Sequence, residues 1–147
     1  MENLFHSQDR EALALRLAQL EPDSARRWGR MEPTEMLGHC AEGFRVALGE
    51  GTQRQVWRGR LLAPLLKAWV LGPRPFRKGV PTDPSFLPAP GADFQAERLR
   101  LATLLDRFVR RGPEAAASAI HPFFGRMRGD EWGRLMAKHL DHHLRQF

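Results

Sequence analysis

The apolar residues of the chain recur at helical spacing in four or five stretches, and almost no stretch alternates as a strand would. The first predicted helix begins at Ser7, which can serve as its N-cap, and ends near Leu20, just before a proline. The second begins at Pro33, a residue that suits the first helical position, and ends at Leu48, before a glycine-containing turn. The N-terminal third of the chain therefore predicts two amphipathic helices.

The same reading predicts three more helical segments. A third helix lies within residues 53–70 and is interrupted, or starts afresh, at Pro64. The fourth follows Asp93, whose side chain can cap it, and ends at Gly112-Pro113. Asp130 is expected to cap a last helix that runs to the end of the chain. The predicted fold is therefore all-α, with the helices packed as a bundle.

Residues 72–91 separate these helices and hold most of the prolines, so no helix is predicted there. Loops of this length in a compact domain usually have a function or lack order. Four apolar residues are spaced to dock on the helices, and three basic residues accompany them: Phe76, Val80, Phe86, Leu87, Arg74, Arg77 and Lys78. We expect the loop to line the entry to a site between the helices. The alternative is a connector that merely crosses the bundle.

Length and composition limit the class of protein. The 147 residues suit one domain spanning 1–147, and 42% hydrophobic residues are enough for a core. No apolar run approaches the roughly 20 residues of a membrane span, and the N-terminus does not read as a secretory signal. The single cysteine, Cys40, excludes an internal disulfide. These features predict a cytoplasmic protein that does not enter membranes.

The net charge of +6 raises the question of an anionic partner. The arginines that dominate the basic count are scattered along the chain, which is typical of a solvated surface and does not favour nucleic-acid binding. A small anionic molecule suits this distribution better. Composition alone does not identify the partner further.

Three histidines lie within five positions of the last helix, in "KHLDHHLRQF". With about 100° per residue, His139 and His143 fall within about 60° of Trp132, at the centre of the apolar face, and His142 points to its edge. Buried imidazoles need polar partners. One core histidine is usually satisfied by a carbonyl or hydroxyl, whereas a pair at i and i+4 is also the spacing with which a helix supplies two ligands to one metal ion.

A third ligand is expected from another helix. His39 lies on the inward stripe of the second helix with Met36 and Gly43, and Gly43 leaves room for an approaching group. Cys40 is about 100° around the helix from His39 and reads as a small core residue. His6 lies near the N-terminus, and His121 precedes a proline in a loop. His39, His139 and His143 are therefore the predicted metal ligands.

The segments "WGRMEPTEMLGHCAE", "PFRKGVPTDPSF" and "HPFFGRMRGDEWGRLMAKHLDHHLRQF" resemble the DinB/YfiT-like superfamily of metalloenzymes, over about residues 28–147. The resemblance implies an up-and-down four-helix bundle that forms homodimers. It also implies a divalent ion, commonly zinc or nickel, held by one histidine of the second helix and an HxxxH pair of the last, which are again His39, His139 and His143. Some members transfer low-molecular-weight thiols, and others have no demonstrated activity.

Three neutral ligands leave open positions on an ion, as in catalytic sites. The ion could activate water or bind a thiolate, and the lack of an obvious general base favours the thiol. Glu35 and Glu42 lie near His39 in sequence but read as surface residues. The first hypothesis is a metal-dependent thiol S-transferase or hydrolase with a small-molecule substrate. The alternative is a non-catalytic metal- or ligand-binding stress-response protein.

The motif "HPFFG" is interpreted as structural. Phe123 and Phe124 would anchor the loop on the bundle, and Gly125 would permit the turn into the last helix. His121 could still form a polar wall of the site. His142 is expected at the rim of the site or in solvent.

Overall fold

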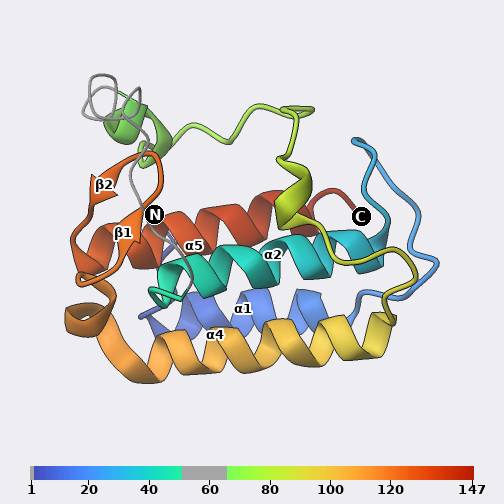
Figure 1. The fold of residues 1–147 in the computed structure, drawn as a ribbon, viewed down its shortest axis with the longest axis horizontal. Coiled ribbons are helices and arrows are strands. Elements are labelled where there is room, and N and C mark those ends of the chain that lie inside the picture. Colours follow the sequence, from blue (N-terminus) through green and yellow to red (C-terminus); the bar gives the residue numbers. More distant parts are fainter. Residues whose placement is uncertain (1, 51–65) are drawn as a thin grey trace.

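Most of the chain is helical in the structure, a computed structural model that describes residues 2–50 and 66–147. Its elements are the helices α1 (Ser7–Ala18), α2 (Pro33–Ala47), α4 (Phe94–Ala116) and α5 (Gly129–Leu144), the 3-10 turn η1 (Pro84–Phe86), and the two-residue strands β1 (Ile120–His121) and β2 (Gly125–Arg126). Residues 66–70 are also helical. The prediction of a mostly helical fold is confirmed (Figure 1). The start predicted for a helix at Pro64 lies outside the described residues.

Local signals account for the ends of two helices. Pro33 opens α2, and the Glu32 amide donates to the Glu35 carboxylate 2.9 Å away, which satisfies one of the free amides there. Asp93 caps α4 as predicted, accepting from the Ala96 amide at 2.8 Å. Gly112 has φ 76° and ψ 173°, so α4 is kinked there, and a further helical turn follows the break.

Two other predicted caps are wrong. At α1 the cap position belongs to His6, whose side chain makes no capping bond. At α5 it belongs to Arg128, and Glu131 accepts from the Arg128 amide at 2.8 Å. Asp130 instead lies in the first turn, where its negative charge suits the helix N-terminus. The small β1–β2 hairpin was also not predicted, because two-residue strands leave no alternating pattern.

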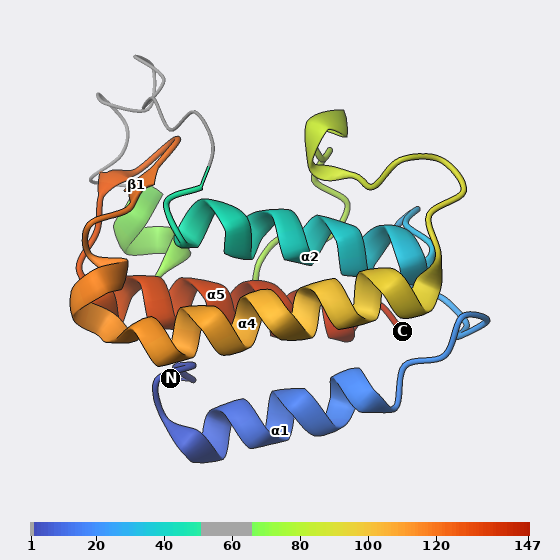
Figure 2. The ribbon, with the colours of Figure 1, turned by 60° about the horizontal axis from the view of Figure 1, so that its bottom comes forward.

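The long helices lie side by side, and pairs of contacting residues give their directions (Figure 2). Glu42 pairs with Arg100, and the Leu48 carbonyl accepts from Arg111, so α2 and α4 run parallel. Arg16 pairs with Asp141 near the ends of α1 and α5, and the Leu4 amide near the start of α1 donates to Gly133 of α5. Those two helices therefore also run parallel. Among the four long described helices, α2 is followed by α4 and runs parallel to it, so these four do not alternate in direction as the helices of an up-and-down bundle would.

The antiparallel packing of α2 against α5 positions the candidate site. Gly43 contacts His139 and Met136, whereas His39, one turn earlier in α2, contacts His143, one turn later in α5. The core residues around this contact are fully buried, among them Met36, Phe44 and Trp132. None of the described helices combines the length and apolar content that crossing a membrane requires.

Candidate metal centre

Three histidine side chains from two helices converge in the interior. His39 of α2 and His139 of α5 bring their Nε2 atoms to 3.0 Å from each other. The ring of His143 lies 4.6 Å from that of His39 and 4.7 Å from that of His139, measured between centroids. Each residue offers one ring nitrogen, and these nitrogens all lie within 4.8 Å of one another. The structure therefore brings together all three residues that the sequence predicted as ligands, and their role as ligands stays a prediction.

The buried face of α5 is the face that helical periodicity predicted for His139 and His143. Trp132 and Met136 are buried on the same face, 1% and 3% exposed. His39 and His143 are buried, and His139 keeps part of its surface accessible. A metal ion held here would thus lie in the packed interior.

Gly43 allows the two helices to approach closely at the cluster. A Cβ atom at Gly43 would stand 3.3 Å from Cε1 and 3.4 Å from Nδ1 of His139. That spacing is tight for a carbon contact, so a larger side chain would push the His139 ring away from His39. The absence of a side chain at Gly43 is therefore part of the geometry of the site.

Burial keeps the three imidazoles neutral. It lowers the pKa of His143 to about 3, with the neighbouring His39 and His142 adding to the effect. Burial also lowers the pKa of His139 well below its ordinary value, and that of His39 below its own, against an opposing contribution from the Phe86 backbone. Neutral imidazole has a free nitrogen lone pair, which is the form that binds metals.

The second nitrogen of two of these rings faces a polar group of the protein. His143 Nδ1 lies 3.5 Å from Oε1 of Gln146, which is itself 2% exposed. His39 Nδ1 is buried and has no hydrogen-bond partner among the described residues, although the Phe86 backbone is near enough to raise the pKa of His39. Histidines that bind metals commonly donate this second N–H to an amide or carbonyl oxygen. The Nε2 atoms of His39 and His139 face each other.

The donor set fits one divalent ion. An ion with bonds of 2.0–2.1 Å to imidazole nitrogens holds them about 3.3 Å apart in tetrahedral geometry. The His39–His139 separation of 3.0 Å is within a few tenths of an ångström of that value. Three neutral nitrogens are also a chemically suitable set for zinc or nickel.

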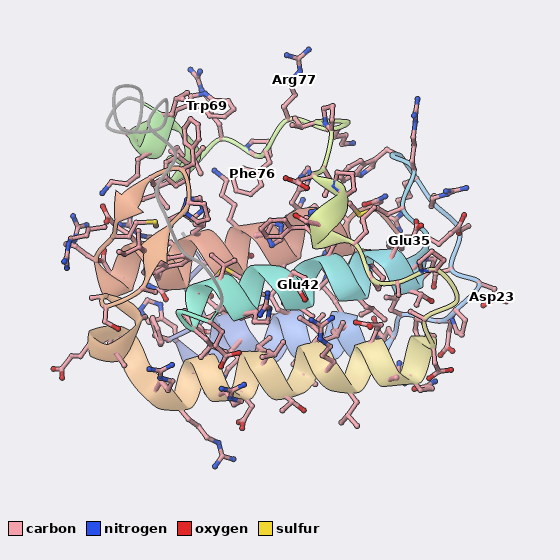
Figure 3. The ribbon with its side chains drawn as sticks, in the orientation of Figure 1. Asp23, Glu35, Glu42, Trp69, Phe76 and Arg77 are labelled. Atoms are coloured by element: carbon pink, nitrogen blue, oxygen red, sulfur yellow. The ribbon has the colours of Figure 1, made fainter. Side chains whose placement is uncertain are left out.

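The proline-rich segment 72–91 lies over this cluster. The Phe86 ring stands 6.3 Å from the His39 ring, and a Cβ atom at Gly38 would meet Pro88 at 2.7 Å. Phe76 points toward α5, where it packs 5.5 Å from the ring of His142, while Arg77 points away from the helices (Figure 3). The expected packing of the segment near the histidines is thus observed.

Of the docking and basic residues predicted in that segment, some do not contact the helices. Val80 is 64% exposed, so its predicted docking is wrong. Arg74, Arg77 and Lys78 are exposed as well, and the Lys78 ammonium lies 5.6 Å from the centre of the Trp28 ring. Of the three basic side chains, Lys78 is thus the one that lies against an aromatic ring of the loop before α2.

The two remaining histidines of interest do not join the cluster. His142 is half-buried and packs 4.6 Å from the Trp28 ring, which agrees with its predicted place at the edge of the apolar face. His121 Nδ1 accepts hydrogen bonds from the amides of Phe123 and Phe124, both at 3.1 Å. Its ring stacks on Phe124, and burial lowers its pKa to about 4. The structural interpretation of "HPFFG" is supported by these contacts.

Three other residues considered near His39 are occupied elsewhere. Cys40 is fully buried, and burial raises the pKa of its thiol, so it is an inert core residue as predicted. Glu35 belongs to the start of α2. Glu42 forms ion pairs with Arg45 and Arg100. None of these groups is directed at the histidines.

Sequence reasoning missed Gln146 and the Phe86 backbone. Gln146 follows His143 by three residues, a spacing that places both on one side of a helix, so that signal was available. Nothing in the sequence pairs Phe86 with His39, because their contact depends on the path of an irregular segment.

A family model matches residues 2–147, and its description is "Protein of unknown function (DUF1569)". The chain belongs to this family. No curated protein matches the chain, and no solved structure does.

The resemblance to the DinB/YfiT-like superfamily is therefore wrong. The matching family covers nearly the whole chain, and nothing in the comparisons indicates that superfamily. The segments that suggested it were "WGRMEPTEMLGHCAE", "PFRKGVPTDPSF" and "HPFFGRMRGDEWGRLMAKHLDHHLRQF". The histidine spacing within them reflects metal-binding chemistry that unrelated helical proteins can share, so this spacing does not identify a family.

Proposed function

We propose that this protein binds one divalent transition-metal ion through His39, His139 and His143. The observation that carries the proposal is the convergence of three buried imidazoles, two of them with Nε2 atoms 3.0 Å apart. Core histidines without a ligand usually find a separate carbonyl or hydroxyl each. Three buried rings that turn toward one another are better explained by a shared cation.

The proposal extends to a catalytic role on a small molecule. An ion held by three histidines keeps open coordination positions. Such an ion would act as a Lewis acid that can activate water or a thiol. Zinc and nickel both accept such a donor set. A thiol S-transferase and a hydrolase are the two reaction classes that fit.

An anionic substrate suits the charge of the site. The three ligands are neutral, so a bound dication would keep its full charge. The carboxylates that flank the ligands in sequence are held in ion pairs: Asp141 with Arg16 and Arg145, and Glu42 with Arg45 and Arg100. A thiolate or carboxylate of the substrate would supply the missing negative charge.

The second candidate function is a metal-binding protein without turnover, such as a stress-response protein. The observation that favours it is the cover of the His39 side of the cluster by Phe86, whose ring centre is 6.3 Å from that of His39, and by Pro88, which packs against Gly38. If that cover stays closed, no substrate reaches the ion.

The experiment that tests metal binding is elemental analysis of protein exposed to zinc and nickel and then desalted. We expect about one ion per chain in the wild type and none in the triple variant His39→Ala, His139→Ala, His143→Ala. The matched control is His6→Ala, because His6 is an exposed imidazole whose Nδ1 atom lies 3.4 Å from the Asp9 carboxylate, outside the cluster. A triple variant that still holds one ion would overturn the proposal.

The two candidate functions are separated by substituting cobalt and titrating azide or a small thiol. A change in the visible cobalt spectrum indicates an open coordination position and supports a catalytic site. An unchanged spectrum, with no hydrolysis or thiol transfer in metal-loaded protein, supports the non-catalytic alternative.

The proposal includes a four-helix bundle of α1, α2, α4 and α5 as the scaffold, with segment 72–91 as part of a long crossover connection. The contacts of α2 with α4 and α5, and of α1 with α5, support it. A homodimer in the cytoplasm is the expected form, and size-exclusion chromatography with light scattering tests the dimer.

A further inference from the structure

Gln146 lies next to His143, one of the three histidines. Its Oε1 atom is 3.5 Å from His143 Nδ1, and both side chains are buried. An amide oxygen can only accept a hydrogen bond, so His143 must donate its Nδ1 proton for this contact to form. The Nε2 atom of His143 is then left with its lone pair.

Several contacts hold the Gln146 amide in this orientation. Its Nε2 group donates to the Met31 carbonyl at 3.5 Å, which distinguishes the nitrogen from the oxygen. Its own backbone carbonyl accepts from the Arg27 amide at 2.7 Å. A Cβ atom at Gly29 would stand 2.6 Å from Gln146 Nε2, and Gly29 has φ 81°, so the loop before α2 encloses the amide closely.

The cost of burying this amide points to a role. Gln146 is 2% exposed, and a leucine in its place would need no hydrogen-bond partners. The chain instead buries a polar group whose acceptor faces His143 and whose donor faces Met31. A polar group placed behind an imidazole in this way fixes which ring nitrogen carries the proton.

We propose that Gln146 is a positioning residue that holds His143 with its proton on Nδ1 and its Nε2 toward His39 and His139. The proposal deepens the proposed metal site and rests on it for its consequence, which is tighter metal binding. Its statement about the tautomer of His143 holds for the metal-free protein too. It can therefore be tested whether or not an ion binds.

The first test is nitrogen-15 NMR of the metal-free chain, in which the ring nitrogens of His143 are assigned by comparison with His143→Ala. We expect Nδ1 of His143 to carry the proton in the wild type. In Gln146→Leu, which removes the acceptor at similar size, we expect this preference to be lost. A proton on Nε2 in the wild type, or an unchanged Nδ1 proton in Gln146→Leu, overturns the proposal.

The second test compares the zinc affinity of two variants that both lose the same hydrogen bond. Gln146→Leu and Gln146→Glu both lose the bond to the Met31 carbonyl, but the glutamate keeps an acceptor for His143. We expect zinc binding, measured by competition with a chromogenic chelator, to weaken about 10- to 100-fold in Gln146→Leu. In Gln146→Glu it should remain at or above the wild-type level.

The outcomes separate this proposal from the metal site itself. Equal weakening in both variants would assign Gln146 to the Met31 contact alone and overturn the positioning role. A wild type that binds no zinc defeats the proposed function, and the NMR result then decides the positioning role by itself. Urea unfolding in the presence of chelator checks that both variants are folded.

Discussion

The Nε2 atoms of His39 and His139 lie 3.0 Å apart although the two residues are 100 positions apart in the chain. Neither helix could create this contact alone, because α2 supplies one ring and α5 the other. In the metal-free protein one nitrogen must donate a proton to the other. With an ion between them, both Nε2 atoms would donate their lone pairs to the ion, so binding would link the two helices.

The first prediction follows from that link. An ion that binds only the folded chain raises the free energy of unfolding, by about 2.7 kcal/mol at a concentration a hundred times its Kd. For a chain of this size we expect the melting temperature to rise by roughly 5–10 °C. Differential scanning calorimetry with zinc and with chelator measures the shift. His39→Ala should show no zinc-dependent shift, and an equal shift in that variant would contradict binding at His39.

The second prediction compares two adjacent histidines. His143 faces the cluster, whereas His142 packs against the Trp28 ring at 4.6 Å. We expect His143→Ala to lose the bound ion and His142→Ala to keep it, as measured by elemental analysis. The two variants remove the same atoms one position apart, so each controls for the other. If His142→Ala loses the ion and His143→Ala retains it, our assignment of the ligands is wrong.

Much of the fold followed from local patterns in the sequence. The start of α2 at Pro33, the cap of α4 at Asp93 and the break at Gly112 were predicted from residues whose backbone preferences are strong. The relative direction of α2 and α4 was not predicted, because it depends on the long connection between these two helices. Helix pairs joined by short loops are antiparallel by necessity, and this pair is not joined in that way.

The three histidines were predictable for a similar reason. Helical periodicity placed His139 and His143 on the face of Trp132, and the burial of that face agrees. The sequence predicted only that segment 72–91 lies near the site, and not that Phe86 and Pro88 lie beside His39 and Gly38. Irregular segments have no periodic pattern from which such contacts could be predicted. The family was misidentified because the likeness rested on short segments, and the ligand spacing within them can occur in unrelated helical proteins.

The third prediction tests the structural role of His121. Its Nδ1 accepts from the amides of Phe123 and Phe124, so His121→Ala leaves two amide donors without that acceptor. We expect a loss of about 1–3 kcal/mol in the free energy of unfolding, measured with urea. The metal content should not change, because His121 is not part of the cluster. Loss of the ion at normal stability would instead make His121 a ligand.

The last prediction concerns acid stability and a carboxylate at the start of α5. Glu131 is 5% exposed, and Lys67 donates to it at 3.0 Å, which ties the helical residues 66–70 to α5. Burial alone would raise the pKa of Glu131. The Arg128 amide and the Lys67 ammonium outweigh it, so the pKa is lowered overall.

A lowered carboxyl pKa contributes stability above the unfolded value of about 4.3, and the contribution is lost as the pH falls through the folded pKa. We expect Glu131→Gln, which keeps the size but not the charge, to lower the free energy of unfolding by about 1–3 kcal/mol at pH 7. The difference from the wild type should stay level down to about pH 5 and shrink below about pH 4. Urea unfolding at a series of pH values measures it, with the exposed Glu11→Gln as the control expected to change stability by less than about 0.5 kcal/mol. A difference that persists undiminished at pH 3 would mean that the charge of Glu131 does not stabilise the fold, and that only the shape of its side chain does.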